Sequence, residues 1–250
     1  MGLSGESVLV TGGARNIGRA IALAVARAGA ATVIVNHLRN TEAAAETCAQ
    51  IQALGVSAEA ITADVGNPRE VQALFKSIRS RHSRLGAIVH AAAMGRFQTL
   101  LEARPAEWDL ALRTNAHSLL LIVREALELL AQPGGRIVAL SSLGSQRYVP
   151  FYGAIGPSKA ALESVVRGLA VELSPRGIGV NAVAGGMIES ETLRRFPQHE
   201  ALREAIVQRT PLGRLGTAEE LADVVIFLCT DAARWISGQT IVADGGFGLL

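Results

Sequence analysis

The stretch from Ser141 to Lys159, SSLGSQRYVPFYGAIGPSK, brings two phenols and an ammonium group close together in the chain. It holds both tyrosines of the sequence, Tyr148 and Tyr152, and one of its two lysines. Apart from Lys76 and the histidines, every other basic residue is arginine. Lysine carries a compact charge with a tunable pKa, whereas arginine stays protonated. Lys159 is therefore a candidate for a site that needs an ammonium group, although chance placement explains the composition equally well.

Short apolar runs alternate with helical patterns along the whole chain. Runs such as VLVTG and RIVAL are apolar without alternation, as in strands of a parallel sheet covered on both faces. We expect strands near 6–11, 31–36, 57–62, 86–91, 135–141, 178–184 and 239–243. We expect helices near 16–28, 41–54, 68–83, 105–131, 157–175, 200–209 and 217–230. This order predicts a single doubly wound Rossmann α/β domain over 1–250, with a seven-stranded, mostly parallel sheet and helices on both faces.

Composition and charge argue against several classes of protein. Hydrophobic residues make up 49% and charged residues 18% of the chain, as in a compact globule. The formal charge of +2 is spread along the sequence, and no apolar run is long enough to span a membrane, so we expect neither nucleic-acid nor membrane binding. Cys48 and Cys229 have no metal-ligand spacing around them and no metal is expected. With no apolar leader before the first strand, these features predict a cytoplasmic protein.

The first strand-to-helix turn carries a cofactor signal. It reads TGGARNIG over 11–18, between an apolar strand and a helical run. Glycines in such a turn let helix N-terminal amides approach a pyrophosphate. A plain tight turn is the alternative. The candidate cofactor residues here are Gly12, Arg15, Asn16, Ile17 and Gly18.

The end of the second strand predicts which nicotinamide cofactor is used. NAD sites place an acid there for the ribose hydroxyls, but this chain has Asn36, with Arg15 and Arg39 in reach. Two guanidinium groups without a carboxylate suit a 2′-phosphate, so we expect NADPH. The alternative is that both arginines are ordinary surface residues.

Two later strand ends add further candidates. Asp64 and Val65 could meet the adenine, although Asp64 could equally cap the next helix. Ala91 and Ala92 are small enough for a cofactor to lie close to the backbone. We expect His90 to be an interior histidine rather than a catalyst.

Asn115 lies in the middle of the expected helix 105–131, where asparagine is unfavourable because its amide competes for backbone hydrogen bonds. It could hold a water or open a backbone carbonyl toward the site, or it could be a locally tolerated residue.

The TG-x3-N-I-G turn and Asn115 are followed by Ser142, Tyr152 and Lys159 in this order. In these features the chain resembles the short-chain dehydrogenase/reductase family over its whole length. Val180–Val183 after the sixth strand, Gly238–Gln239 and Asp244–Gly246 add to the resemblance. It implies a nicotinamide cofactor across the carboxyl ends of the strands and a homotetramer. It also implies that Ile188 and Ser190 lie beside the nicotinamide carboxamide.

The sequence departs from the usual Tyr-x3-Lys pattern of this family. Ile155 stands four residues before Lys159, and the nearest tyrosine is Tyr152, while Ser142 keeps the family distance to the lysine. The resulting Tyr-x6-Lys spacing is similar to that of enoyl-acyl-carrier-protein reductases, with the closest resemblance to the NADPH-dependent FabL type. Two further departures are Asn16 in place of a turn glycine and His90-Ala91 in place of paired asparagines. Asparagine at position 16 tolerates the left-handed geometry that a turn glycine would adopt.

Pro157 gives the tyrosine displacement a physical meaning. A proline fits the first turn of a helix and not its interior, so the helix should begin near Gly156-Pro157 and Tyr152 should lie on the preceding loop. From there Tyr152 could stabilise the enolate oxygen of a thioester while hydride reaches the β carbon. Lys159 would hold the nicotinamide ribose, and Ser142 would orient substrate or tyrosine, unless it is an ordinary strand-end serine. Tyr148 is expected in the pocket wall, with the acting hydroxyl as its alternative role.

The segment 189–210 is expected to form a flap over the substrate, with Leu193, Phe196 and Pro197 lining an acyl channel. Arg194 and Arg195 could meet an acidic carrier protein, although a solvated basic face explains them as well.

Together these features predict an NADPH-dependent enoyl-acyl-carrier-protein reductase acting on an acyl-carrier-protein or CoA thioester, in fatty-acid or polyketide synthesis. A carbonyl reductase of the same fold is the nearest alternative. A non-catalytic NADPH-binding regulator is an alternative of another class.

Overall fold

The computed structural model describes residues 3–130, 134–189 and 199–249. Within them, seven strands form one sheet in the order β3-β2-β1-β4-β5-β6-β7, and every neighbouring pair is parallel. The strands are β1 (Ser7–Thr11), β2 (Thr32–His37), β3 (Ser57–Thr62), β4 (Ala87–His90), β5 (Arg136–Ser142), β6 (Gly179–Gly185) and β7 (Thr240–Ala243). Each begins and ends within one residue of its predicted range, because buried parallel strands have a strong apolar signal.

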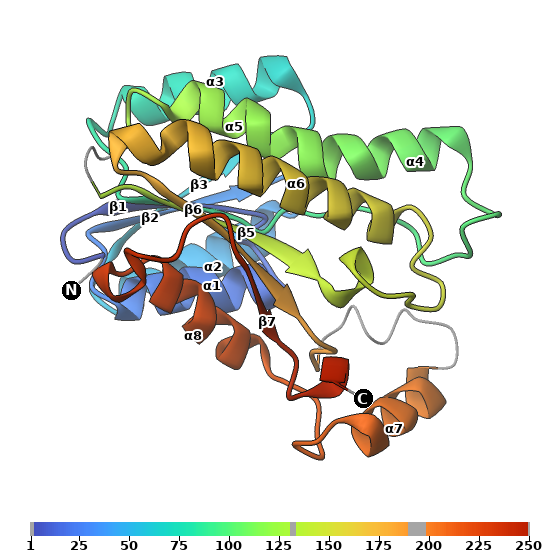
Figure 1. Cartoon of the computed structure of the whole chain (residues 1–250). Coiled ribbons are helices and arrows are strands. Elements are labelled where there is room, and N and C mark those ends of the chain that lie inside the picture. Colours follow the sequence, from blue (N-terminus) through green and yellow to red (C-terminus); the bar gives the residue numbers. More distant parts are fainter. Residues whose placement is uncertain (1–2, 131–133, 190–198, 250) are drawn as a thin grey trace.

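Helices cover both faces of the sheet (Figure 1). One layer contains α1 (Asn16–Arg27), α2 (Thr41–Ala53) and α8 (Ala218–Leu228). The other contains α3 (Pro68–Arg79), α4 (Pro105–Leu112), α5 (Ser118–Ala126) and α6 (Ile155–Leu173). The helix α7 (His199–Arg209) lies apart from both layers, near the C-terminal end of the chain. In the described part of the chain, no helix has the length and apolar character needed to cross a membrane.

Two hydrophobic cores follow from the pleat of the strands. Val8 and Val10 pack in the core under α1 and α8, whereas Leu9 between them packs in the core under α3, α5 and α6. Successive strand residues point to opposite faces, so a continuous apolar run fills both cores. The expected single doubly wound Rossmann domain is confirmed, with a sheet that is entirely parallel in the described residues.

Several predicted boundaries are wrong. The expected helix 105–131 is divided into α4, a π-helical segment at Arg113–His117, and α5. The helix α3 ends at Arg79, before position 83, and shortly afterwards the His82 side chain contacts Ser7 and Glu59. Val180–Val183, which the family resemblance places after the sixth strand, lie inside β6, in agreement with the strand predicted near 178–184.

Candidate active site

The turn between β1 and α1 packs unusually close to the loop after β4. Gly12 has a φ of 65°, and a Cβ added there would lie 2.8 Å from Cα of Ala92. A Cβ on Gly18 would collide with the carbonyl oxygen of Gly12. Asn16 adopts a left-handed φ of 50°, so asparagine replaces the expected glycine in a conformation that it tolerates. The turn leads directly into the N-terminus of α1, the end of a helix at which a pyrophosphate binds in such folds.

The end of β2 is cationic, but Asn36 does not face it. The Asn36 amide is buried and donates to the carbonyls of Ile61 at 3.3 Å and Ala63 at 3.1 Å. The expectation that Asn36 occupies the ribose-binding position is therefore wrong, because this side chain is used to join β2 to β3. Arg15 is exposed, and Asn40, with its amide oxygen turned toward it, accepts from Arg15 Nε and Nη1 at 3.2 Å each.

Exposed Arg39 precedes Asn40 in the same loop, so the pair of arginines expected for a 2′-phosphate lies at one edge. His37 adds a feature that the sequence did not single out. Its buried Nδ1 has no hydrogen-bond partner among the described residues, whereas its Nε2 contacts Thr62 at 3.1 Å.

The residues that follow β3 have structural contacts. Asp64 Oδ1 accepts from the Gly66 amide at 2.8 Å, and Val65 is buried. The cap of α3 is Asn67 rather than Asp64, since Asn67 accepts from the Arg69 amide.

His90 is an interior histidine, as expected. Its Nδ1 contacts Thr11 Oγ1 and its Nε2 contacts Ser118 Oγ, both at 3.0 Å. Burial and the nearby Lys159 lower the pKa of His90 to about 3, so the ring is neutral at physiological pH. Ala91 and Ala92, which follow it, are the residues against which the Gly12 turn packs.

Asn115 connects the loop after β4 to α6. Its Oδ1 accepts from the Met94 amide at 2.7 Å, and its Nδ2 donates to the Met94 carbonyl at 2.9 Å and to Ser158 Oγ at 2.8 Å. The side chain is fully buried in the π-helical segment. Its amide protons are thus directed to protein groups rather than to a water, and it fixes the residue that precedes Lys159.

Lys159 is buried on α6. Its Nζ donates to the carbonyl of Leu140 at 2.6 Å. Burial lowers the pKa of Lys159 to about 8, and the Glu163 carboxylate opposes that shift. Glu163 is itself buried and accepts from Ser141 Oγ at 2.5 Å and Ser145 Oγ at 2.6 Å. The sequence interpretation missed Glu163, although its position four residues after Lys159 places both on one helix face.

Ser142 and Tyr152 come together beside this helix. Burial raises the pKa of Tyr152, and a hydrogen bond with the Ser142 side chain opposes the shift. Tyr152 precedes α6, as Pro157 predicts, and its carbonyl accepts from the Gly156 amide at 2.9 Å. The helix itself begins at Ile155, with Pro157 in its first turn.

Ile155 occupies the position four residues before Lys159. It is buried, and a Cβ built on Gly95 would collide with its Cγ1, so the isoleucine packs against the backbone of Gly95. Tyr148 is 87% exposed, so its expected place in the pocket wall is wrong. Of the two tyrosines, only Tyr152 contacts Ser142 in this structure.

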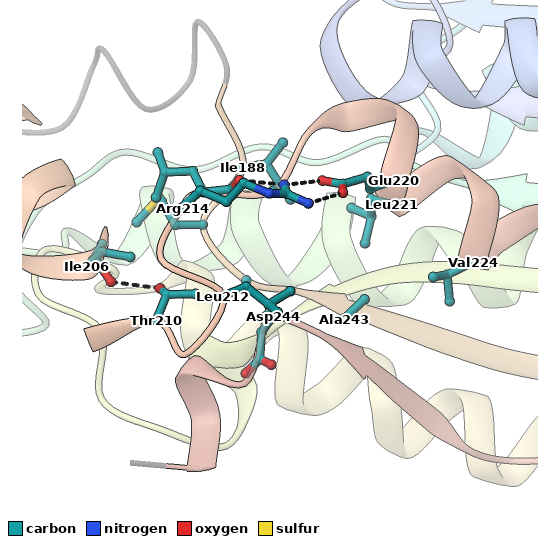
Figure 2. A pocket seen from close by; sticks show the side chains of 15 residues that line it. Ile188, Ile206, Thr210, Leu212, Arg214, Glu220, Leu221, Val224, Ala243 and Asp244 are labelled. Atoms are coloured by element: carbon teal, nitrogen blue, oxygen red, sulfur yellow. Dashed lines mark hydrogen bonds and ion pairs between the residues drawn. The ribbon is translucent and has the colours of Figure 1, made fainter. Parts of the chain in front are cut away.

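An apolar cavity of about 220 Å³ lies where α8 and the ends of β6 and β7 meet (Figure 2). Ile188 lines it together with Leu221, Val224 and Ala243, and Arg214 and Glu220 form an ion pair at its edge. Ile206 and Leu215 also line it, and they belong to an apolar cluster that includes Tyr152, Phe97, Met187, Leu202, Val207 and Phe247. Apolar surface therefore continues from the cavity to Tyr152.

Part of the expected flap 189–210 lies outside the residues that the structure describes. Glu189 and α7 are described, and α7 contributes Ile206 to the cavity. The remaining candidates Ser190, Leu193, Arg194, Arg195, Phe196 and Pro197 lie outside the described residues.

Three features together define a Rossmann-type nicotinamide-dependent oxidoreductase site. They are the parallel sheet, the glycine turn after its first strand, and the Ser142, Tyr152 and Lys159 side chains at the carboxyl edge of the sheet. A family model described as "Enoyl-(Acyl carrier protein) reductase" matches residues 12–248. The chain belongs to the short-chain dehydrogenase/reductase family.

The relatives include reductases named for different substrates. The chain is 41% identical over 244 residues to the 1-cyclohexenylcarbonyl-CoA reductase of Streptomyces collinus, covering 97% of this chain and 86% of that one. It is 36% identical over 242 residues to the 3-oxoacyl-[acyl-carrier-protein] reductase FabG of Staphylococcus aureus (strain Mu50), covering 96% and 97%. Among solved structures, the angucycline C-6 ketoreductase LanV with bound NADP is similar, with a TM-score of 0.91, 34% identity and coverage of 100% and 98%.

Proposed function

We propose that this protein is an NADPH-dependent reductase of the C2=C3 double bond of enoyl thioesters. The observation that carries the proposal is the position of the site hydroxyl. Ile155 packs against Gly95 one helical turn before Lys159, and the phenol that contacts Ser142 is Tyr152 on the preceding loop. Carbonyl reduction needs a proton donor at the oxygen of the hydride-accepting carbon. Enoyl reduction instead needs a donor at the thioester oxygen, farther from that carbon.

The residues at the carboxyl edge fit a dinucleotide phosphate. The Gly12–Gly18 turn presents the N-terminus of α1 to the pyrophosphate. Arg15 and Arg39 would bind the 2′-phosphate, with Asp64, Val65, Ala91 and Ala92 along the adenine side. Ile188 and Ser190 would hold the carboxamide. The NADP in the related ketoreductase structure supports NADPH as the cofactor.

Each catalytic residue then has a distinct role. NADPH, when bound, would supply hydride to the β carbon, and the α carbon would take up a proton from water. Tyr152, which burial keeps protonated, donates a hydrogen bond to the thioester oxygen as negative charge develops there. Ser142 holds the Tyr152 hydroxyl, Lys159 binds the nicotinamide ribose hydroxyls, and Asn115 fixes Ser158 beside Lys159.

The substrate is an enoyl chain on CoA or an acyl carrier protein, the carriers for which the two relatives are named. The apolar cluster around Tyr152 suits the acyl group. A homotetramer and a cytoplasmic location belong to the same proposal.

The second candidate is a carbonyl reductase. The 36% identity to a 3-oxoacyl reductase and the likeness to a ketoreductase structure favour it. It requires a proton donor near the hydride-accepting carbon, which Ile155 cannot supply.

Thioester assays distinguish these functions. NADPH oxidation is followed with crotonyl-CoA and 1-cyclohexenylcarbonyl-CoA, then with acetoacetyl-CoA. We expect turnover on at least one enoyl thioester and little on acetoacetyl-CoA. Turnover on acetoacetyl-CoA alone would establish the carbonyl reductase, and NADPH binding without turnover on any thioester would favour a regulator. Equal kcat/KM for NADH and NADPH would contradict the cofactor assignment.

A further inference from the structure

Tyr152 lies ahead of α6, so the helix does not hold its side chain as it holds Lys159. A residue on a loop has more conformational freedom than one on a helix face, and a donor in a site must be fixed in place to stabilise developing charge. Contacts from other parts of the chain must therefore orient the Tyr152 ring.

The backbone of Gln98 pairs with the segment that carries Tyr152. The Gln98 amide donates to the Phe151 carbonyl at 2.8 Å, and the Gln98 carbonyl accepts from the Gly153 amide at 3.0 Å. These two bonds form a parallel bridge between Gln98 and Tyr152. Phe151 adopts a left-handed φ of 58°, which is unfavourable for a bulky side chain and indicates that the pairing imposes this local conformation.

The Tyr152 ring is bounded by an aromatic side chain and a glycine. Phe97 stacks on it with centroids 6.3 Å apart and an interplanar angle of 18°. A Cβ on Gly144 would collide with Cδ1 of Tyr152, so the glycine leaves room for the ring. Stacking of this kind favours one ring orientation beyond the effect of burial alone.

Gln98 is anchored in turn to α4. Its side chain is buried, and its Nε2 donates to Glu107 Oε2 at 2.9 Å. Glu107 is held by the Arg104 side chain at 2.7 Å and by the Arg104 amide at 3.1 Å. The support of the tyrosine thus extends from its ring to a capped helix.

We infer that Phe97 and Gln98 are positioning residues for Tyr152, holding its ring and hydroxyl in place from outside α6. This inference rests on the role of Tyr152 in the proposed function. If Phe97 were only a wall of the acyl site, its replacement would change substrate binding and leave the environment of the Tyr152 phenol unchanged.

The two-tyrosine composition of the chain allows a direct test. In a Tyr148→Phe background only Tyr152 titrates, and its ionisation is followed by near-ultraviolet absorbance. We expect Phe97→Leu to lower the pKa of Tyr152 toward its ordinary value and to reduce kcat about three- to tenfold with an unchanged KM for NADPH. Phe97→Trp, which keeps a flat ring, should restore both. Gln98→Met, which removes the donor to Glu107 at similar volume, should act in the same direction as Phe97→Leu.

Phe227→Leu is the matched control, since Phe227 is a partly exposed phenylalanine on α8. It should leave the Tyr152 titration and kcat at the parent values. The inference is overturned if Phe97→Leu and Gln98→Met leave the Tyr152 titration unchanged. It is also overturned if Phe97→Leu raises only the KM for the acyl thioester. Absence of turnover on every thioester would remove the proposed function, while the titration would still decide the positioning role.

Discussion

At the scale of single residues, the proposed chemistry depends on the position of the Tyr152 hydroxyl. Ile155 fills the position one turn before Lys159 with a packed apolar side chain, and Tyr152 contacts Ser142 from the loop. The Tyr152 phenol is protonated at neutral pH and can donate a hydrogen bond, and burial raises its pKa further. A neutral donor is suited to an oxygen that gains charge in the transition state.

We therefore expect Tyr152→Phe to lower kcat for enoyl-thioester reduction about 10²- to 10³-fold, the usual effect of removing one oxyanion donor. NADPH binding, measured by fluorescence titration, should change little because the ribose contacts are assigned to Lys159. Tyr148→Phe should retain parental kcat, since Tyr148 is exposed. Full turnover in Tyr152→Phe together with its loss in Tyr148→Phe would assign the hydroxyl to the other tyrosine.

At the scale of elements, α6 links the lysine to the loop that carries Ser142. Glu163 lies one turn after Lys159 and accepts from Ser141 and Ser145, the serines on either side of Ser142. Its charge also raises the pKa of Lys159, against the larger lowering by burial. One carboxylate thus holds the loop by hydrogen bonds and raises the pKa of the ammonium by its charge.

This arrangement predicts a pH dependence. The folded-state pKa of Lys159 is about 8, below its ordinary value, so the ammonium is lost as the pH rises through about 8 and kcat/KM for NADPH should fall there. Glu163→Gln removes the raising effect, so the fall should begin at lower pH. A pH profile of kcat/KM measures the shift. Glu172→Gln, an exposed change on the same helix, should leave the profile at its parental position, and an unshifted profile in Glu163→Gln would contradict this role.

At the scale of the whole molecule, several large apolar side chains are exposed at the surface outside the two cores. Val171 on α6 is 76% exposed and Trp235 is 96% exposed. Apolar side chains mark a contact between subunits where they gather into a contiguous patch. The tetramer that the family resemblance implies stays a prediction, and we take Val171 as the position at which to test it.

We expect light scattering to give a mass about four times the 26.2 kDa of the chain. Val171→Glu should lower that mass, because it would bury a carboxylate in the interface. Leu54→Glu, at the exposed end of α2, is the control and should keep the parental mass. A monomeric parent protein would rule out the tetramer.

The seven strands and the displaced tyrosine were determined by the sequence alone. Strand runs such as Val8–Val10 are apolar on both faces, and Pro157 is compatible only with the start of a helix, so both features are local. The glycine turn and its left-handed Asn16 are local in the same sense.

Tertiary structure decided which way individual side chains point and what they contact. Asn36 is directed to β3, and Tyr148 lies in solvent. The π-helical segment around Asn115 and the Gln98–Tyr152 bridge join residues far apart in the chain. Such contacts depend on how whole elements pack, which the periodicity of a single segment does not encode.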